Sequence, residues 1–116
     1  MAVVELSSKK EFDHTIRNGL SIIDFNAHWC GPCRDQEPIF DALDEAFNGK
    51  VTVAKVSIDD HQLIAMDLNI QSIPTIILFN QGRELQRLVG FQDGEALSDA
   101  LQAALDCGCG AGSRKQ

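Results

Sequence analysis

Apolar residues form two kinds of pattern along this chain: short continuous runs, and positions spaced three or four residues apart. The mostly apolar run at residues 20–25 predicts a strand buried on both faces, residues 51–58 predict another buried strand, and residues 73–80 predict a strand with a proline at its entry. A shorter apolar run at residues 3–6 predicts a further strand near the start. A glycine-containing turn leads from the last run into residues 84–89, so we expect an antiparallel hairpin there.

The second pattern, apolar positions at helical spacing, predicts helices between and after these strands. The expected helices cover about residues 9–18, 32–47, 61–68 and 94–105. Ser8 followed by Glu11 is a capping-box pattern at the start of the first helix. Pro38 lies inside the second helix, where a proline predicts a kink.

The order of elements predicts an α/β fold. Strands that alternate with helices form parallel units, and the final hairpin and helix complete the order β-α-β-α-β-α-β-β-α. A central mixed β-sheet flanked by helices on both faces satisfies this order. We expect residues 1–106 to form that domain and the glycine-rich residues 107–116 to form a flexible tail. Sites in such sheets lie where a central strand meets the next helix, here between Phe25 and Cys30.

Composition limits the function classes. A chain of 116 residues with 44% hydrophobic and 23% charged residues fits one soluble domain. A net charge of −7 argues against nucleic-acid binding and favours a monomer. The first residues lack the basic and then apolar pattern of an export signal, and no run reaches the roughly 18 apolar residues of a membrane span. We therefore expect no membrane partner and a cytoplasmic location, where thiols are kept reduced.

Cys30 and Cys33 carry the candidate chemistry. Two cysteines in a C-x-x-C motif between a strand and a helix indicate a thiol–disulfide exchange site. Cys30, just before the helix, lies where unpaired N–H groups and the positive dipole end favour a thiolate. Cys33 should be shielded and less acidic, so we expect Cys30 to attack a target disulfide and Cys33 to resolve the mixed disulfide. The alternative is half of a zinc site, which would need Cys107 and Cys109; we expect no metal and no cofactor.

The residues around this motif resemble the thioredoxin family. The similar positions are Asp24, Phe25, Ala27, the run Trp29-Cys30-Gly31-Pro32-Cys33, Pro38, Ala54, Lys55, Val56, Asp59, Ile73, Pro74, Thr75, Phe79, Gly82 and Gly90. The resemblance covers about residues 3–106. It implies a thioredoxin fold and a general protein-disulfide reductase, an enzyme that acts on disulfide-containing proteins and is recharged by an NADPH-dependent thioredoxin reductase.

The resemblance also implies residue roles. Asp24 would be a buried carboxylate beneath the cysteines, with Lys55 pointing toward it. An aspartate inside an apolar strand should have a raised pKa and can take a proton from Cys33 near neutral pH. The alternative is a solvated aspartate at a strand end. Pro74 would be a cis-proline facing the disulfide, leaving the Ile73 backbone to pair with an extended substrate segment; a trans proline opening a strand is the alternative.

Four further residues complete the predicted substrate site. Gly31 removes side-chain bulk where a partner approaches, and Pro32 suits the first turn of a helix. Trp29 and Gly90 would form an apolar rim around Cys30, although Trp29 fits a core position as well.

Several residues depart from the family pattern. Asn26 stands where many members have tryptophan, and residues 35–37 are more polar than usual, whereas Arg34 keeps a positive charge. His28 favours the thiolate if it is charged, or is a solvated loop residue. These departures bear on partner choice, including which reductase recognises this surface.

Some alternatives stay open at this point. Cys107 and Cys109 in the tail either exchange with the Cys30–Cys33 pair, bind a soft metal ion such as copper(I) or zinc, or are incidental. Two alternatives to a general reductase also stay open. The chain could act as a disulfide oxidant or isomerase, or the fold could serve as a non-catalytic binding subunit or chaperone. The Gly-Pro dipeptide between the active-site cysteines resembles reductases.

Overall fold

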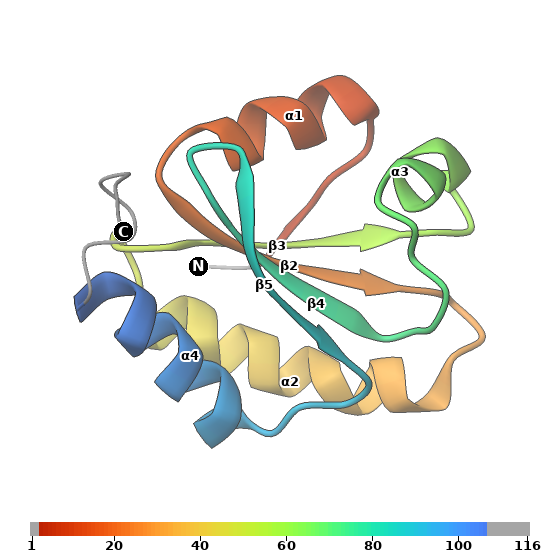
Figure 1. The fold of residues 1–116 in the computed structure, drawn as a ribbon. Coiled ribbons are helices and arrows are strands. Elements are labelled where there is room, and N and C mark those ends of the chain that lie inside the picture. The colour runs from red at the N-terminus through yellow and green to blue at the C-terminus, as the bar shows by residue number, and fades with distance from the viewer. Residues whose placement is uncertain (1–2, 107–116) are drawn as a thin grey trace.

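The computed structural model describes residues 3–106, which form one mixed β-sheet with helices on both faces (Figure 1). The predicted tail with Cys107 and Cys109 lies outside the described residues. The elements in chain order are β1 (Val4–Glu5), α1 (Lys9–Arg17), β2 (Leu20–Asn26), α2 (Gly31–Ala46), β3 (Thr52–Ser57), α3 (Gln62–Asp67), β4 (Thr75–Asn80), β5 (Arg83–Val89) and α4 (Gly94–Asp106).

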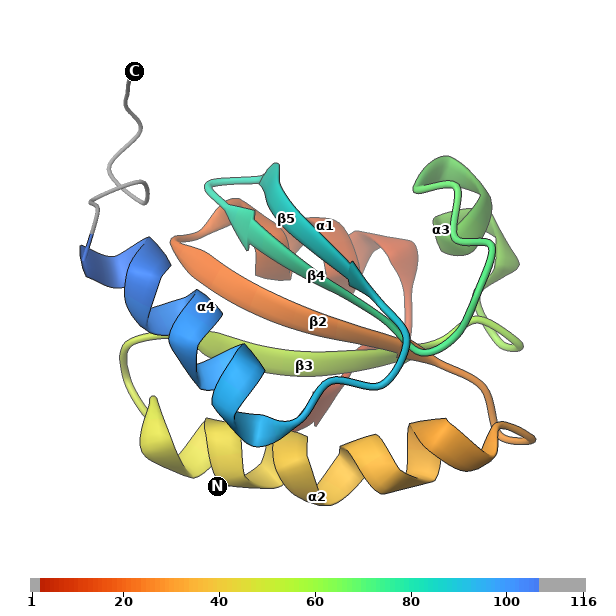
Figure 2. The ribbon, with the colours of Figure 1, turned by 60° about the horizontal axis from the view of Figure 1, so that its bottom comes forward.

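The strand order in the sheet is β1-β3-β2-β4-β5, which places β2 at the centre. β3 pairs with β1 and β2 in parallel, whereas β4 pairs with β2 and β5 antiparallel. The predicted element order and the predicted hairpin of β4 and β5 are therefore confirmed. Helices α2 and α4 cover one face of the sheet, and α1 and α3 cover the other (Figure 2).

Two apolar cores lie on the two faces of the sheet. One includes Phe40 and Leu43 of α2 and Leu97 of α4, packed against the sheet. The other includes Phe12 of α1, whose ring makes edge contacts with Phe25 and Phe79. Because β2 has a helix layer on both sides, its residues 20–25 are all buried, as the continuous apolar run predicts.

The start of α1 differs in one respect from the predicted capping box. Ser8 caps the helix, and its hydroxyl accepts a hydrogen bond from the Glu11 N–H at 3.0 Å. The Glu11 carboxylate does not return to Ser8. It accepts hydrogen bonds from the Ser7 N–H at 2.6 Å and from the Ser7 hydroxyl at 3.0 Å, so it pairs one residue earlier than expected.

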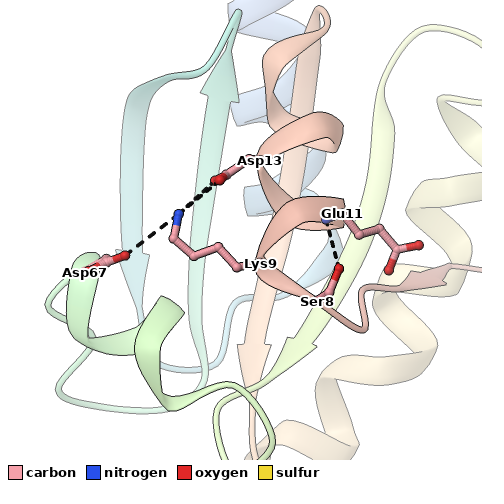
Figure 3. Close-up of polar contacts among 5 residues, drawn as sticks. All are labelled: Ser8, Lys9, Glu11, Asp13 and Asp67. Atoms are coloured by element: carbon pink, nitrogen blue, oxygen red, sulfur yellow. Dashed lines mark hydrogen bonds and ion pairs between the residues drawn. The ribbon is translucent and has the colours of Figure 1, made fainter.

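Helix α3 is joined to α1 by Lys9, as Figure 3 shows. The Lys9 ammonium lies 3.0 Å from the carboxylate of Asp13, also in α1, and 3.8 Å from the carboxylate of Asp67 in α3. All three side chains are solvent-exposed, so these ion pairs contribute little to stability. Helix α3 lies at the end of the sheet where β2 leads into α2 (Figure 1).

Other boundaries lie close to the predicted ones. β4 begins at Thr75 and not at residue 73, because the Ile73–Pro74 segment precedes it and Pro74 has no N–H for a strand ladder. Helix α2 continues past Pro38 to Ala46. Among residues 3–106, no helix has the length and apolar character needed to cross a membrane.

Candidate active site at the start of helix α2

Cys30 and Cys33 form a disulfide at the carboxyl end of β2, as the sequence predicts. Cys30 is the N-cap residue of α2, and Cys33 lies in the first turn, with 5.2 Å between their Cα atoms. The Cys33 N–H donates a hydrogen bond to the Cys30 sulfur at 3.2 Å. A sulfur at this position receives one of the N–H groups that the first turn of a helix leaves unpaired, which stabilises a thiolate there.

The two cysteines are almost equally buried, which differs from the expectation that Cys33 alone is shielded. Cys30 is 5% exposed and Cys33 is 3% exposed, and both pack against Ala27, Ile58 and Ile73. Burial therefore does not distinguish them in this oxidised state. Their positions on α2 distinguish them, because only the Cys30 sulfur is at the N-cap, where it accepts the Cys33 N–H.

Asp24 is a buried carboxylate in the middle of β2, only 1% exposed, so the solvated alternative is wrong. Burial raises the pKa of Asp24 to about 7, because water no longer stabilises its charge. A hydrogen bond from the Asn26 side chain and the positive charge of Lys55 act in the opposite direction, whereas the negative charge of Glu37 raises the pKa further. A carboxyl with this pKa exchanges protons near neutral pH.

Lys55 lies beside Asp24 on β3, where the two residues are register partners. Both line a cavity of about 40 Å³ that is also lined by Glu37 and Asp41 of α2. Lys55 and Glu37 also line a larger cavity of about 270 Å³ that reaches Cys33. The smaller cavity, at Asp24, is large enough for a water molecule, and the larger one is at Cys33; Lys55 and Glu37 line both.

Trp29 lies on the surface beside Cys30 and not in the core, since it is 71% exposed. Its indole N–H donates to the Asp59 carboxylate at 3.2 Å, and the His28 N–H donates to the other oxygen of the same carboxylate at 3.3 Å. Asp59 therefore holds the loop before Cys30. In the sequence, Asp59 stands out only as a position similar to the thioredoxin family, and no local pattern predicts its hydrogen bonds to Trp29 and His28.

His28 is exposed and faces the acidic turn that precedes α3. Its Nε2 lies 3.3 Å from the Asp60 carboxylate and 3.4 Å from the Ser57 hydroxyl. His28 thus lies exposed in the loop with its ring beside Asp60 and Ser57, which agrees with the solvated-loop interpretation.

The predicted substrate residues lie around the disulfide. Ile73 packs against the cysteines, and the Ile73–Pro74 peptide bond is cis, as expected. The Gly90 N–H donates to the Pro74 carbonyl at 2.8 Å, and Gly90 has a φ of +92° that favours glycine. Gly31 and Pro32 are exposed at the start of α2. The structure thus places Ile73 with the cysteine pair and joins Gly90 to Pro74, while the substrate-binding role of these residues stays a prediction.

Gln36 is a residue of this region that the sequence analysis misses. It belongs to the polar segment 35–37, in which the other two residues are exposed, but Gln36 itself is completely buried. Its side-chain amide donates to the Gln92 carbonyl at 2.8 Å and accepts from the Gln92 N–H at 2.9 Å. The only signal in the sequence is helical spacing, because Gln36 lies one turn after Cys33 on the inward side of α2.

Comparisons with known proteins agree with this site. A family model described as Thioredoxin matches residues 3–103. The chain is 43% identical to a thioredoxin of Chlamydia caviae over 95 residues, which are 82% of this chain and 92% of the relative. It is 34% identical to a thioredoxin of Staphylococcus saprophyticus over 105 residues, which are 90% of this chain and 100% of the relative.

The fold is similar to solved thioredoxins as well. A mutant thioredoxin from Halobacterium salinarum superimposes with a TM-score of 0.82 at 32% sequence identity, covering 88% of this chain and 89% of the other. The matches extend over the strands and helices that carry the cysteine pair. This chain therefore belongs to the thioredoxin family, as a protein-disulfide oxidoreductase that exchanges the Cys30–Cys33 disulfide with the disulfides of protein substrates.

Proposed function

We propose that this chain is a general protein-disulfide reductase in which Cys30 is the nucleophile and Cys33 the resolving thiol. One observation carries the assignment: the Cys30 sulfur is at the N-cap of α2 and accepts the Cys33 N–H. After reduction, the same N–H and the helix dipole favour the thiolate of Cys30 over that of Cys33. The thiolate is the form that attacks disulfides.

The proposed reaction has two exchange steps. The Cys30 thiolate attacks one sulfur of a target disulfide, so a Cys30–target bond forms, the target S–S bond breaks, and the departing target thiolate takes a proton. Cys33 then loses its proton and attacks the Cys30 sulfur. The Cys30–Cys33 bond forms, the Cys30–target bond breaks, and the second target sulfur leaves as a thiolate that takes a proton, so two electrons pass from the dithiol to the target.

Asp24 is proposed as the base that receives the Cys33 proton, with Lys55 as the positive charge beside it. A pKa of about 7 supports this role, because a substantial fraction of Asp24 is then ionised at neutral pH. The cavity at Cys33 and the cavity at Asp24 are both lined by Glu37 and Lys55, and each has room for water, which supports proton transfer from Cys33 to Asp24 by way of water.

The proposed substrate groove surrounds Cys30. We assign exposed Trp29, Gly31 and Pro32 to its helix side, and Ile73, Pro74 and Gly90 to the other side; the packing of Ile73 with the cysteines and the Gly90–Pro74 hydrogen bond support this assignment. An extended segment of the substrate would pair with the Ile73 backbone while its disulfide faces Cys30.

The protein needs electrons for each cycle, and we propose an NADPH-dependent thioredoxin reductase as their source. The resemblance to bacterial thioredoxins supports this partner. We also propose a cytoplasmic location, where the reduced dithiol persists, and a monomeric state, with residues 1–106 as the single domain and residues 107–116 as its tail.

Insulin reduction coupled to NADPH oxidation by a bacterial thioredoxin reductase tests this function. Wild-type protein should support turnover, and Cys30→Ser should remove it. Cys107→Ser combined with Cys109→Ser is the matched control, because it removes two thiols without touching the proposed site. Turnover that survives in Cys30→Ser would overturn the proposal and favour a binding role for the fold.

A further inference from the structure

We propose that Gln36 is a positioning residue for protein substrates: it fixes the loop of residues 90–93 against the helix that carries the cysteines. This inference rests on the proposed substrate groove, one side of which contains Gly90. It concerns how the groove is held in shape, and it assigns to Gln36 no part in the exchange of sulfur atoms.

The first observation is the pairing of one side chain with one peptide unit. Gln36 is completely buried, and its amide oxygen and nitrogen bind the N–H and the carbonyl of Gln92 at 2.9 and 2.8 Å. A buried amide satisfied on both sides by the same residue defines the position of that residue closely. Gln36 is three residues after Cys33, so the contact ties the loop directly to the first turns of α2.

The second observation is that the loop continues to the opposite wall of the groove. The Gln92 side chain donates to the carbonyls of Val89 and Gly90 at 3.4 and 3.3 Å. Gly90 in turn donates to the Pro74 carbonyl at 2.8 Å. Hydrogen bonds therefore connect α2 with the Pro74 segment in the order Gln36, Gln92, Gly90, Pro74.

The third observation is that apolar packing holds this loop weakly. Phe91, the one large apolar residue of the loop, is 45% exposed and is not part of the buried core. Asp93 is tied to α4, where its carbonyl and carboxylate accept the N–H groups of Leu97 and Ala96. Between Gly90 and Asp93, the bonds to Gln36 are the ones that join the backbone to α2.

Loss of the Gln36 hydrogen bonds should affect protein substrates and small disulfides differently. Replacing Gln36 with an apolar residue of similar size leaves the Gln92 N–H and carbonyl without their partner, which favours loop conformations that reach water. A protein substrate that docks along the groove must then order the loop on binding, whereas a small disulfide needs access to Cys30 alone. We expect a loss of affinity for proteins and no loss of chemical reactivity.

Single-turnover kinetics with pre-reduced protein separate these effects. The variant Gln36→Met is mixed with insulin and with a small aromatic disulfide, and the rate is followed against substrate concentration. The half-saturating concentration of insulin should rise about tenfold, while the maximal rate and the rate with the small disulfide stay within about twofold. A parallel fall with both substrates, or no change with either, would overturn the inference.

Two matched controls exclude general effects. Gln102→Met makes the same chemical change at an exposed position on α4 and should behave as wild type. Phe12→Leu weakens the core on the far face of the sheet and should leave the insulin half-saturation unchanged. If Phe12→Leu reproduces the effect of Gln36→Met, lower stability alone is responsible and the inference is wrong.

Trp29→Ala distinguishes failure of this inference from failure of the groove. If Trp29→Ala raises the insulin half-saturation and Gln36→Met does not, the groove stands and the role of Gln36 is wrong. If neither variant does, the proposed groove itself is wrong. Amide hydrogen exchange gives an independent readout, because exchange at residues 90–93 should be faster in Gln36→Met and unchanged in Gln102→Met.

Discussion

Asp24 and Lys55 are register partners on adjacent parallel strands, and together they line a cavity of about 40 Å³ beneath the active-site helix. Glu37 of α2 reaches the same cavity, so one buried carboxyl is placed between a cation and an anion. The pKa of Asp24 therefore depends first on burial, then on the hydrogen bond from Asn26, and then on these two charges, each of which can be removed by a single substitution.

Asp24→Asn should make the protein more stable at neutral and alkaline pH. The folded-state pKa of about 7 lies above the ordinary value of 3.8, so the folded protein retains a proton that the unfolded chain has released. Stability of the wild type should fall as pH rises from about 4 to 7 and then level off. Over roughly three pH units the loss approaches about 4 kcal/mol.

Urea unfolding from pH 4 to pH 9 checks this prediction. The difference between Asp24→Asn and the wild type should be small at pH 4 and reach its full value above pH 7. Asp41→Asn, which changes a carboxyl at the edge of the same cavity, is the matched control. A pH-independent difference would contradict the raised pKa of Asp24.

Lys55→Met and Glu37→Gln should shift the pKa of Asp24 in opposite directions. Loss of the positive charge raises the pKa, and loss of the negative charge lowers it, because the two residues act on the same carboxylate. Observing the Asp24 carboxyl carbon by NMR during a pH titration measures both shifts. Shifts of the same sign would show that these variants change burial and not the local charge.

Cys33→Ser should trap a covalent complex with a substrate disulfide, because the attack by Cys30 still occurs and the resolving thiol is absent. Cys30→Ser should trap none, since Cys33 lacks the N-cap position. Intact-mass spectrometry under non-reducing conditions, after mixing each reduced variant with insulin, detects the adduct. An adduct formed by Cys30→Ser in place of Cys33→Ser would reverse the proposed roles.

Ser8→Ala should destabilise the protein by about 1 kcal/mol, because the Glu11 N–H loses the hydroxyl that caps α1. Ser7→Ala is the control and should cost less, since the Ser7 N–H still donates to the Glu11 carboxylate. Thermal or urea unfolding of the two variants measures the difference. Equal losses would contradict the assignment of Ser8 as the cap.

Much of the fold and the site is predictable from the sequence, because strong local patterns agree with the tertiary structure. The continuous apolar run of β2 predicts a strand covered on both faces, and the same burial accounts for the raised pKa of Asp24. Only two residues separate Cys30 from Cys33, so their proximity follows from the chain itself.

Contacts between segments that are far apart in the sequence are harder to predict from it. Gln36 lies in a run of polar residues, and its burial depends on Gln92, which is 56 residues later. The bond from Trp29 to Asp59 likewise joins two loops that no local pattern relates. The capping box at α1 differs by one residue, because Ser7 and Ser8 both offer groups that Glu11 can reach.

The most direct test of the central claim is a redox titration of the Cys30–Cys33 pair. The protein is equilibrated in dithiothreitol buffers of stepwise increasing reducing strength, free thiols are trapped, and mass spectrometry counts them at each cysteine. A reductase should keep the pair oxidised until the buffer is strongly reducing, because its dithiol gives electrons away readily. A pair already reduced in mildly reducing buffers would contradict this account and identify a disulfide oxidant or isomerase.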